Sequence, residues 1–425
     1  MRQDVKKILV LFPSEWDKRE LAAPRYAGRY SFLYEGRAGE PFRGSALLGF
    51  DVRRFIDRVV KRHARSGIVG VFSTEDMLGV PAAAIVARRL GLPGPEPRRV
   101  ILAQHKFYAR RLQERVLPEA TPRFTLISPH GLSAQAEGLA YPCFVKPVKA
   151  TFSVLAGRVE GERELLERLR FGPIERLVLK RLLRPFNDLL ALYGDGECDA
   201  LHFLAEDLVE GTQVTLDGCV SDGRVEIFGV VDSVMYPGTH AFHRFEYPSA
   251  LAGSVRGRME DVARRLAARS GYDHGCFNVE MVHDPRTDEI RIIEMNLRLS
   301  PQFADLYESV DGCNPYDVQI DLCTGRRPSW NRTTGRFPHA ASIALRTFSG
   351  SRTVAAPDPD TVRDIERQIP GSRILVFGKP GRTMKWEMRA LGSYRYAVMN
   401  LGGTSREAVL DAARVAGERL VFRFR

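Results

Sequence analysis

The sequence lacks any apolar run of the roughly 20 residues that a membrane-spanning helix needs. Its first apolar run, residues 8–12, is too short for the core of a secretory signal, and charged residues follow it. The six cysteines are scattered without a CxxC pair, which argues against a thiolate metal site and against a disulfide framework. These absences favour a cytoplasmic protein that does not cross a membrane.

Internal repeats and low-complexity tracts are also absent, and the shares of apolar (44%) and charged residues (27%) are typical of globular proteins. A chain of 425 residues exceeds one ordinary core, so we expect two or three domains. The 63 lysines and arginines outnumber the 52 aspartates and glutamates, for a net charge of +11. That excess favours an anionic partner such as a nucleotide. The basic residues form no block interleaved with aromatics, which disfavours nucleic acid.

Strand and helix patterns alternate at short spacing in the first hundred residues. Residues 6–12 and 68–74 are apolar runs typical of buried parallel strands. Residues 50–67 and 80–94 have apolar positions at helical spacing and end at glycine. This alternation predicts an α/β domain over residues 1–100.

Helical and strand patterns are mixed beyond residue 100. Further helices are predicted over residues 103–116, 162–170, 174–194, 255–270 and 405–420. Pro185 interrupts the helical pattern of residues 174–194, so we expect that stretch to be broken into shorter helices. The whole chain is therefore expected to combine α/β and α+β portions.

The most informative stretch is FNVEMVHDPRTDEIRIIEMN, residues 277–296, which has the pattern of a β-hairpin. With PRTDE as its loop, Glu280 pairs with Glu294 and Val282 with Ile292. This register gathers the apolar side chains on one face and the polar ones on the other, whereas a slip by one residue would mix them.

Two carboxylates that lie directly opposite each other repel, and a divalent cation between them reverses the sign of that interaction. Glu280, Glu294 and the amide of Asn296 form an oxygen ligand set of the kind that holds Mg²⁺. Lys146, at the end of a predicted strand in FVKP, can place a point charge on a phosphate. The residues therefore predict a metal–phosphate site, with a merely solvated polar face as the alternative.

Six segments, taken in order, resemble the ATP-grasp superfamily: STEDMLGVPAAAIVARRLGLPG, HKFYARRL, CFVKP, AEDLVEG, GCFNVEMV and IIEMNLRLS. They follow the family's order over residues 5–330. The C-terminal YRYAVMNLGGTSREAVLDAARVAGERL is similar to the tail of the carboxylate–amine ligase and biotin carboxylase branches. The resemblance implies an N-terminal Rossmann-like pre-ATP-grasp domain (1–100), a central subdomain with a lid (101–210), and a C-terminal subdomain with the metal site and an α+β tail (211–425).

The resemblance also implies the cofactors ATP and Mg²⁺, with Mn²⁺ as a substitute, and one or two metal ions. The ligands it implies for the metal are Glu280, Glu294 and Asn296. The residues it implies for ATP are Lys106, Lys146, Ser153, Glu206, Asp207, Leu208, Val209 and Gln213. Glu206 would bind the adenine amino group, and the backbone of residues 207–209 would lie against the base. Lys146 and Arg298 would act in catalysis, Arg298 by stabilising the transferred phosphoryl group and the acyl phosphate.

The activity implied is an ATP-dependent ligase that activates a small-molecule carboxylate as an acyl phosphate and joins it to an amine, such as an amino acid. His243 and Arg244, in the stretch just before the helix that leads to the hairpin, are candidates to meet a substrate carboxylate. Alternatives are other ATP-grasp chemistry, either biotin-carboxylase-like or phosphorylation of a non-carboxylate oxygen, and a non-catalytic nucleotide-binding protein. A homodimer is left open.

The sequence departs from the family pattern at several positions. The loop after Lys146 contains less glycine than a typical phosphate-covering loop, and Gln213 stands where a glutamate often contacts ribose. Residues 171–200 are longer and more basic than usual, which is compatible with a cover over the active site or with an amphipathic surface element.

Overall fold

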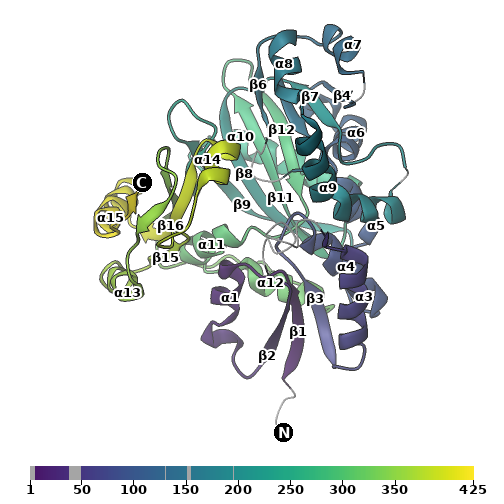
Figure 1. The fold of residues 1–425 in the computed structure, drawn as a ribbon. Coiled ribbons are helices and arrows are strands. Elements are labelled where there is room, and N and C mark those ends of the chain that lie inside the picture. Colours follow the sequence, from purple (N-terminus) through teal and green to yellow (C-terminus); the bar gives the residue numbers. More distant parts are fainter. Residues whose placement is uncertain (1–4, 38–48, 130, 151–154, 195) are drawn as a thin grey trace.

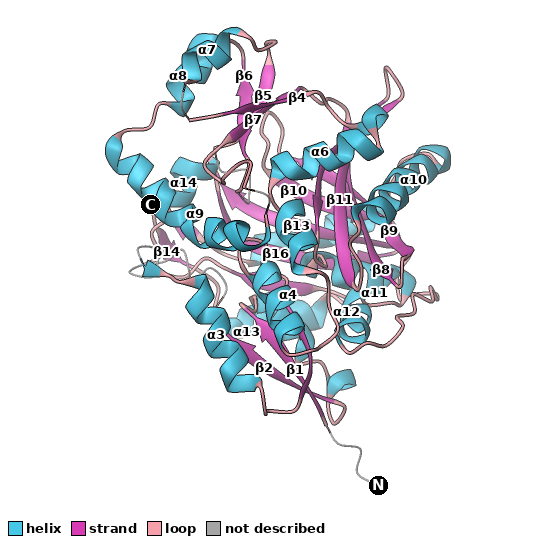
Figure 2. Cartoon of the chain, turned by 90° about the vertical axis from the view of Figure 1, so that its right-hand side faces the viewer, coloured by secondary structure: helices cyan, strands magenta, loops and turns pink. Residues whose placement is uncertain are grey.

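The computed structural model describes residues 5–37, 49–129, 131–150, 155–194 and 196–425. Among the described residues, three larger β-sheets follow one another along the chain, and β14 (Thr353–Ala355) and β17 (Arg423–Phe424) near the C-terminus form a further two-stranded sheet. Figure 1 shows the N-terminal sheet at the bottom, the large sheet in the centre and a small sheet at the top, with the C-terminal segments on the left. Helices and strands are both abundant (Figure 2), so the expected combination of α/β and α+β portions is confirmed.

The N-terminal sheet is parallel, with strand order β2-β1-β3. Its elements are β1 (Lys6–Leu11), α1 (Glu15–Leu21), η1 (Pro24–Tyr26), β2 (Tyr30–Glu35), α3 (Val52–His63), β3 (Ile68–Phe72) and α4 (Gly79–Arg89). Residues 8–11 of β1 are buried on both faces, as this apolar run predicts, whereas the first two residues of the strand are exposed lysines. Leu9 and Leu11 pack with α3 and α4, whereas Ile8 and Val10 pack with residues from later in the chain.

The small sheet is antiparallel, with order β4-β7-β5-β6. Its strands are β4 (Phe124–Ile127), β5 (Cys143–Pro147), β6 (Gly157–Val159) and β7 (Phe203–Asp207). The helices of this part of the chain are α5 (Pro97–Ala103), α6 (Lys106–Val116), η3 (Pro118–Ala120), α7 (Leu132–Glu137), α8 (Glu162–Leu169) and α9 (Pro173–Tyr193).

Helix α9 is continuous through Pro185, so the expected break there is wrong. A proline inside a helix costs roughly 3 kcal/mol because it removes a hydrogen bond and crowds the preceding turn. Here Pro185 is buried, and its neighbours Phe186, Leu189 and Leu190 join the core formed by α3 and α4. That burial offsets the cost, and it makes α9 pack against the N-terminal region.

The large sheet has eight strands in the order β12-β11-β8-β9-β10-β13-β16-β15. They are β8 (Thr212–Ser221), β9 (Arg224–Met235), β10 (Phe242–Tyr247), β11 (Gly275–Asp284), β12 (Glu289–Asn296), β13 (His339–Thr347), β15 (Arg373–Val376) and β16 (Tyr394–Gly403). The remaining elements are α10 (Gly253–Ser270), η4 (Pro301–Phe303), α11 (Ala304–Asp311), α12 (Pro315–Cys323), β14 (Thr353–Ala355), α13 (Pro359–Gln368), α14 (Lys385–Leu391), α15 (Arg406–Arg419) and β17 (Arg423–Phe424).

The two faces of the large sheet differ. The register pairs Glu280 with Thr215 and Phe245 with Ser342, and the strand β9 between them keeps these four side chains on one face. We call this the inner face; it packs against α11 and the N-terminal sheet. The outer face packs against α10, α13 and α15. In the part of the chain that the structure describes, no helix combines the length and the apolar character needed to cross a membrane.

Candidate active site

The two acids of the hairpin, Glu280 on β11 and Glu294 on β12, lie directly opposite each other. Asn278 and Asn296 form the adjacent pair on the same face. The predicted register is confirmed at this end of the hairpin. Asn296 Nδ2 lies 3.3 Å from both Glu294 Oε1 and Asn278 Oδ1. The inner face therefore carries a row of two acids and two amides.

The register shifts by one residue beyond Glu280, because Ile293 forms a β-bulge on the edge strand β12. Met281 faces Ile292, so the predicted pairing of Val282 with Ile292 is wrong. A bulge adds one residue to one strand, and the alternation of side chains does not reveal its position.

The carbonyl groups at this bulge accept hydrogen bonds from cations on other elements. Arg110 of α6 donates through Nη1 to Ile292 O at 2.9 Å and through Nη2 to Ile293 O at 2.7 Å. Lys146 of β5 donates through Nζ to Ile293 O at 3.5 Å. Buried carbonyls of an edge strand need such donors, because they have no neighbouring strand. The bulge thus connects the hairpin to α6 and to the small sheet.

Glu206, on β7, is buried and has cations on both carboxylate oxygens. Its Oε1 lies 2.8 Å from Arg110 Nε, and its Oε2 lies 2.8 Å from Lys146 Nζ. Burial opposes ionisation, yet Lys146 and Arg110 lower the pKa of Glu206 to about 2. Burial lowers the pKa of Lys146 to about 8 against the attraction of Glu206. The Glu206 carboxylate is thus held by two cations, and its contact with adenine stays a prediction.

Lys106, the first residue of α6, is the cation closest to the carboxylate pair, with Nζ 3.1 Å from Glu294 Oε2. Burial opposes ionisation of Glu294, but Lys106 and Lys146 lower its pKa. The pKa of Glu280 is raised, first by burial and then by the Glu294 carboxylate. Gln213 Nε2 donates to Glu280 Oε2 at 3.1 Å. The negative charge of Glu294 is therefore neutralised by lysine, whereas the Glu280 carboxylate is still repelled by the Glu294 carboxylate.

Arg298 lies just beyond the end of β12 and connects the hairpin to the N-terminal region. Its Nε is 2.9 Å from Oδ1 of Asp76, which lies between β3 and α4. Its Nη1 donates to Ser300 Oγ at 3.2 Å, and Ser300 donates to Asp217 Oδ1 at 2.6 Å. Asp76 was not predicted as a site residue, although it belongs to the first motif of the resemblance.

Lys149 is a second site residue that the sequence analysis did not identify. It is buried, and its Nζ donates to Asp76 O at 3.0 Å and to Gln104 Oε1 at 2.9 Å. Burial lowers its pKa to about 7 against the opposing effect of Asp76. The ammonium lies 4.5 Å from the ring centroid of Phe186 on α9. The signal in the sequence was a second lysine three residues after Lys146.

A cavity open to solvent, with about 440 Å³ of space not filled by protein atoms, lies among these groups. Its charged lining comprises Asp76, Lys106, Arg110, Lys146, Lys149 and Glu294. Cations outnumber acids in this set, so the cavity suits an anionic ligand. The basic helix α9 is near the cavity through Phe186, whose ring contacts Lys149.

The residues of the carboxylate pair fit a divalent cation. Glu280, Glu294 and Asn296 offer only oxygen ligands from one row, which is the ligand type that Mg²⁺ prefers. A cation between the two acids would remove the repulsion that raises the pKa of Glu280.

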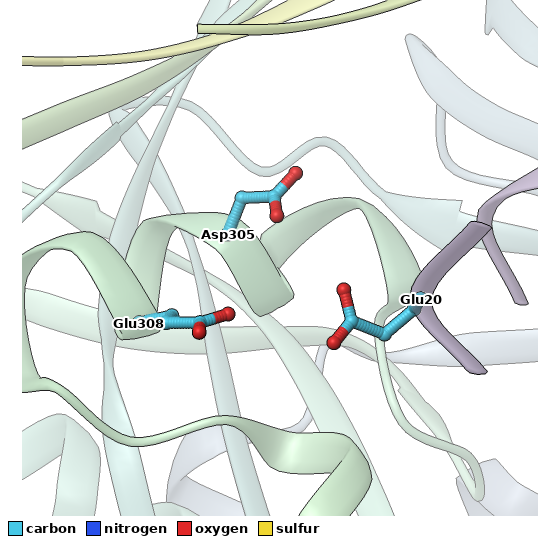
Figure 3. A group of neighbouring side chains, drawn as sticks. All are labelled: Glu20, Asp305 and Glu308. Carbon is cyan, nitrogen blue, oxygen red and sulfur yellow. The ribbon is translucent and has the colours of Figure 1, made fainter. Parts of the chain in front are cut away.

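A second acidic group, formed by Glu20, Asp305 and Glu308, lies apart from this cavity (Figure 3). Arg25 binds both Glu20 and Glu308. Arg373 Nη1 lies 2.8 Å from Glu20 Oε2 and 2.8 Å from Asp305 Oδ1. Guanidinium groups already neutralise these acids, so this group is an ion-pair network that joins α1 to α11.

The remaining predicted ATP residues lie near the end of β7 or outside the described residues. Asp207 Oδ2 lies 2.8 Å from Arg123 Nε. Leu208 and Val209 lie half-buried in the loop between β7 and β8, and Ser153 falls outside the described residues. The structure therefore does not test the predicted backbone contacts with the base.

The two candidate substrate residues on β10 lie away from the hairpin. Arg244 is on the outer face of the sheet, opposite in direction to Glu280, and its Nε lies 2.5 Å from Glu246 Oε1. His243 lies at a bulge, with its ring centroid 4.4 Å from that of Tyr236. The structure thus brings neither side chain to the carboxylate pair.

Several solved structures resemble this chain over nearly its full length. An L-amino acid ligase from Bacillus licheniformis is 17% identical, with a TM-score of 0.74 and 100% of both chains covered. A carboxyaminoimidazole ribonucleotide synthase from Aspergillus clavatus, complexed with ATP, is 14% identical, with a TM-score of 0.67 and 98% of both chains covered.

A third similar structure is the biotin carboxylase domain of a 2-oxoglutarate carboxylase from Hydrogenobacter thermophilus, in complex with MgADP, ADP and bicarbonate. It is 15% identical, with a TM-score of 0.64, and the match covers 99% of this chain and 91% of that one. No family model matches the sequence, and the search of curated proteins found no match to it.

Proposed function

Because the chain has the ATP-grasp fold, we propose that it is an ATP-dependent ligase that activates a carboxylate as an acyl phosphate and joins it to an amine. The observation that carries this proposal is the carboxylate pair Glu280–Glu294 at the edge of a cavity rich in lysine and arginine. The similarity to an L-amino acid ligase favours a small carboxylate and an amino acid or another amine as substrates.

The phosphates of ATP are assigned to the cationic cavity. Lys106 and Lys146 point their ammonium groups at Glu294 and Glu206, and both line the cavity. A lysine that already has an acidic partner can share its charge with a phosphate, because its ammonium carries three donors. We assign Glu206, residues 207–209 and Gln213 to the adenosine part.

Glu280, Glu294 and Asn296 are the residues that would hold Mg²⁺, with Mn²⁺ as a substitute. The bound ion would supply charge neutralisation on the phosphoryl oxygens. The protein's own contribution is to hold two acids face to face on a rigid hairpin and to keep the cations close by.

Arg298 is the residue assigned to the reacting group. Its guanidinium is fixed by Asp76 and Ser300, which limits its motion before substrate arrives. The γ-phosphoryl group passes from ATP to a carboxylate oxygen, giving ADP and an acyl phosphate. The amine nitrogen then attacks the acyl carbon, inorganic phosphate leaves, and the amine loses a proton. An amine that arrives neutral needs no separate base.

The proposal is tested by incubating the purified protein with MgATP and pools of amino acids, amines and small carboxylic acids. ADP and phosphate are measured for each pool, and products are identified by mass. The proposal predicts ADP and phosphate release that requires both a carboxylate and an amine, with an amide product. Release with bicarbonate alone, or a phosphorylated product without an amide, would instead assign other ATP-grasp chemistry. Failure to bind MgATP would overturn the proposal.

A further inference from the structure

Two arginines face each other across the neighbouring strands β13 and β16. Arg346 and Arg395 are directly opposite in the register, because Tyr396 forms a bulge in β16. Both side chains are half-buried. Like charges directly opposite on a sheet are destabilising, and burial increases that cost. The arrangement therefore requires an explanation.

Neither arginine is bound to a carboxylate of the described residues. Arg346 donates through Nε to Phe242 O at 3.2 Å and through Nη1 to Ser393 Oγ at 3.0 Å. Arg395 donates through Nη1 to Gln302 Oε1 at 3.3 Å. All three acceptors are neutral. Burial, and then the proximity of Arg346, lower the pKa of Arg395 to about 10.

Most of the other half-buried arginines that the structure describes have acidic partners, with Arg256 as an exception. Arg298 binds Asp76, and Arg244 binds Glu246. The pair Arg346–Arg395 therefore differs from the usual way in which this chain neutralises its guanidinium groups. Two guanidinium groups close together can bind one carboxylate or phosphate through several parallel hydrogen bonds.

The arginine pair lies on the same face of the sheet as the carboxylate pair. Gln302, which accepts from Arg395, donates through Nε2 to Ser342 Oγ on the inner face at 2.8 Å. Ser300, two residues before Gln302, contacts Arg298 at the proposed reaction centre. Two residues of chain span at most about 7 Å, so a substrate of modest length can reach from Arg298 toward the arginine pair.

Aromatic rings lie around the two arginines. The Arg395 guanidinium is 5.1 Å from the ring centroid of Phe377. The Tyr236 hydroxyl donates to Ala344 O at 2.8 Å, and its ring lies 5.1 Å from the exposed Phe348. Such a surrounding excludes part of the solvent and strengthens a charged hydrogen bond.

We infer that Arg346 and Arg395 form a subsite for a non-reacting acidic group, a carboxylate or a phosphate, carried by a substrate of the ligase. The claim that a substrate carries this acidic group rests on the proposed function. The claim that the two arginines bind an anion does not. It predicts that the enzyme selects substrates with an acid group beyond the carboxylate that is activated.

The anion site is tested first without any substrate. Crystals of the full chain are soaked in sodium bromide, and the anomalous signal of bromide is measured. We expect a peak within about 4 Å of both guanidinium groups, at hydrogen-bonding distance for a halide. The peak should be absent from Arg395→Gln crystals and present in Arg414→Gln crystals, which change an exposed arginine of α15. No peak between the two arginines in the unmodified protein would overturn the inference.

A second experiment tests the subsite with substrates, using the acid and the amine that give phosphate release. Each acidic group that does not react is replaced in turn, a carboxylate by its amide and a phosphate by its alcohol. We expect one such replacement to raise KM about ten- to hundredfold in the unmodified enzyme, the scale of losing a charged hydrogen bond. The same replacement should have little effect in Arg346→Gln and Arg395→Gln, because the partner is already gone.

The two experiments separate the possible failures. Bromide bound between the arginines, together with equal use of the acid and its amide, would identify an adventitious anion site and would overturn the subsite. A loss of kcat with unchanged KM in both arginine variants would also overturn it, because a subsite acts on binding. If no substrate pool gives phosphate release, the proposed function fails while the bromide measurement still decides on the anion site.

Discussion

The inner face of the large sheet carries two pairs of like charges. In each pair, the two residues face each other across neighbouring strands. Glu280 lies opposite Glu294, and Arg346 lies opposite Arg395. The acidic group in Figure 3 is different, because each of its carboxylates is bound by an arginine. A cluster of like charges therefore does not by itself indicate a binding site in this protein. A binding site is indicated where like charges remain incompletely neutralised beside a binding surface.

The two pairs also differ in sign, and this predicts ligands of opposite sign. The carboxylate pair borders a cationic cavity and suits a metal with phosphate, whereas the arginine pair suits a carboxylate or a phosphate alone. The repulsion within each pair lowers the stability of the protein without ligand. A substitution that removes the repulsion should therefore lower activity or ligand binding without lowering the free energy of unfolding.

Breaking the carboxylate pair should have the largest effect. Glu294→Gln keeps the side-chain shape but removes a metal ligand's charge and the partner of Lys106. We expect ATP turnover to fall by at least about a hundredfold, the scale of losing one charge-stabilising group. Phosphate release measures this effect, and circular dichroism should show an intact fold. The control Glu289→Gln changes an exposed acid on the same strand and should retain full turnover. Full turnover in Glu294→Gln would remove the metal assignment.

Removing a cation beside the carboxylate pair should have the next largest effect. Lys146→Met keeps most of the side chain and removes its charge, so the affinity for a non-hydrolysable ATP analogue should fall about ten- to hundredfold. Isothermal titration with Mg²⁺ present gives the dissociation constant. Lys18→Met, at an exposed position on α1, is the matched control. An unchanged dissociation constant for Lys146→Met would take this lysine out of the nucleotide site.

Reversing one charge of the arginine pair sharpens the comparison. Arg395→Glu converts two facing cations into an ion pair with Arg346, which should raise the free energy of unfolding by about 0.2–1 kcal/mol. Urea denaturation measures the free energy of unfolding. The value for Arg395→Gln should lie between those of the unmodified protein and Arg395→Glu. A lower free energy of unfolding for Arg395→Glu would show that the two guanidinium groups do not repel.

The carboxylate pair should also make the stability of the protein depend on pH. Burial and the Glu294 carboxylate raise the pKa of Glu280, so the folded protein binds that proton more tightly than the unfolded chain does. The contribution of Glu280 to the free energy of unfolding is therefore greatest at low pH and is lost as pH rises through the raised pKa. Glu280→Gln should show a weaker decline over the same range, measured by denaturation without Mg²⁺. Equal pH dependence in both proteins would contradict the proposed repulsion.

The sequence allowed much of the hairpin to be predicted. The alternation of polar and apolar residues places Glu280 opposite Glu294, because a slip of one residue would put apolar side chains on the wrong face. The bulge at Ile293 could not be predicted, because it depends on Arg110 and Lys146, which come from other elements and bind the carbonyls there.

Other parts of the fold escaped prediction for related reasons. Strand β2 is a half-exposed edge strand with a weak pattern. Pro185 is tolerated in α9 because it is buried and its neighbours in the helix pack into the core formed by α3 and α4. Lys149 and Arg395 become notable only through what surrounds them: a cavity in one case and a second arginine in the other. Local sequence carries neither piece of information.

The most direct test of the central claim is isothermal titration of the protein with a non-hydrolysable ATP analogue, with and without Mg²⁺. The account predicts that Mg²⁺ strengthens binding in the unmodified protein and in Glu289→Gln, and that it has no such effect in Glu294→Gln. Binding that does not depend on Mg²⁺ or on Glu294, or no binding at all, would contradict the assignment of the carboxylate pair to a metal–nucleotide site.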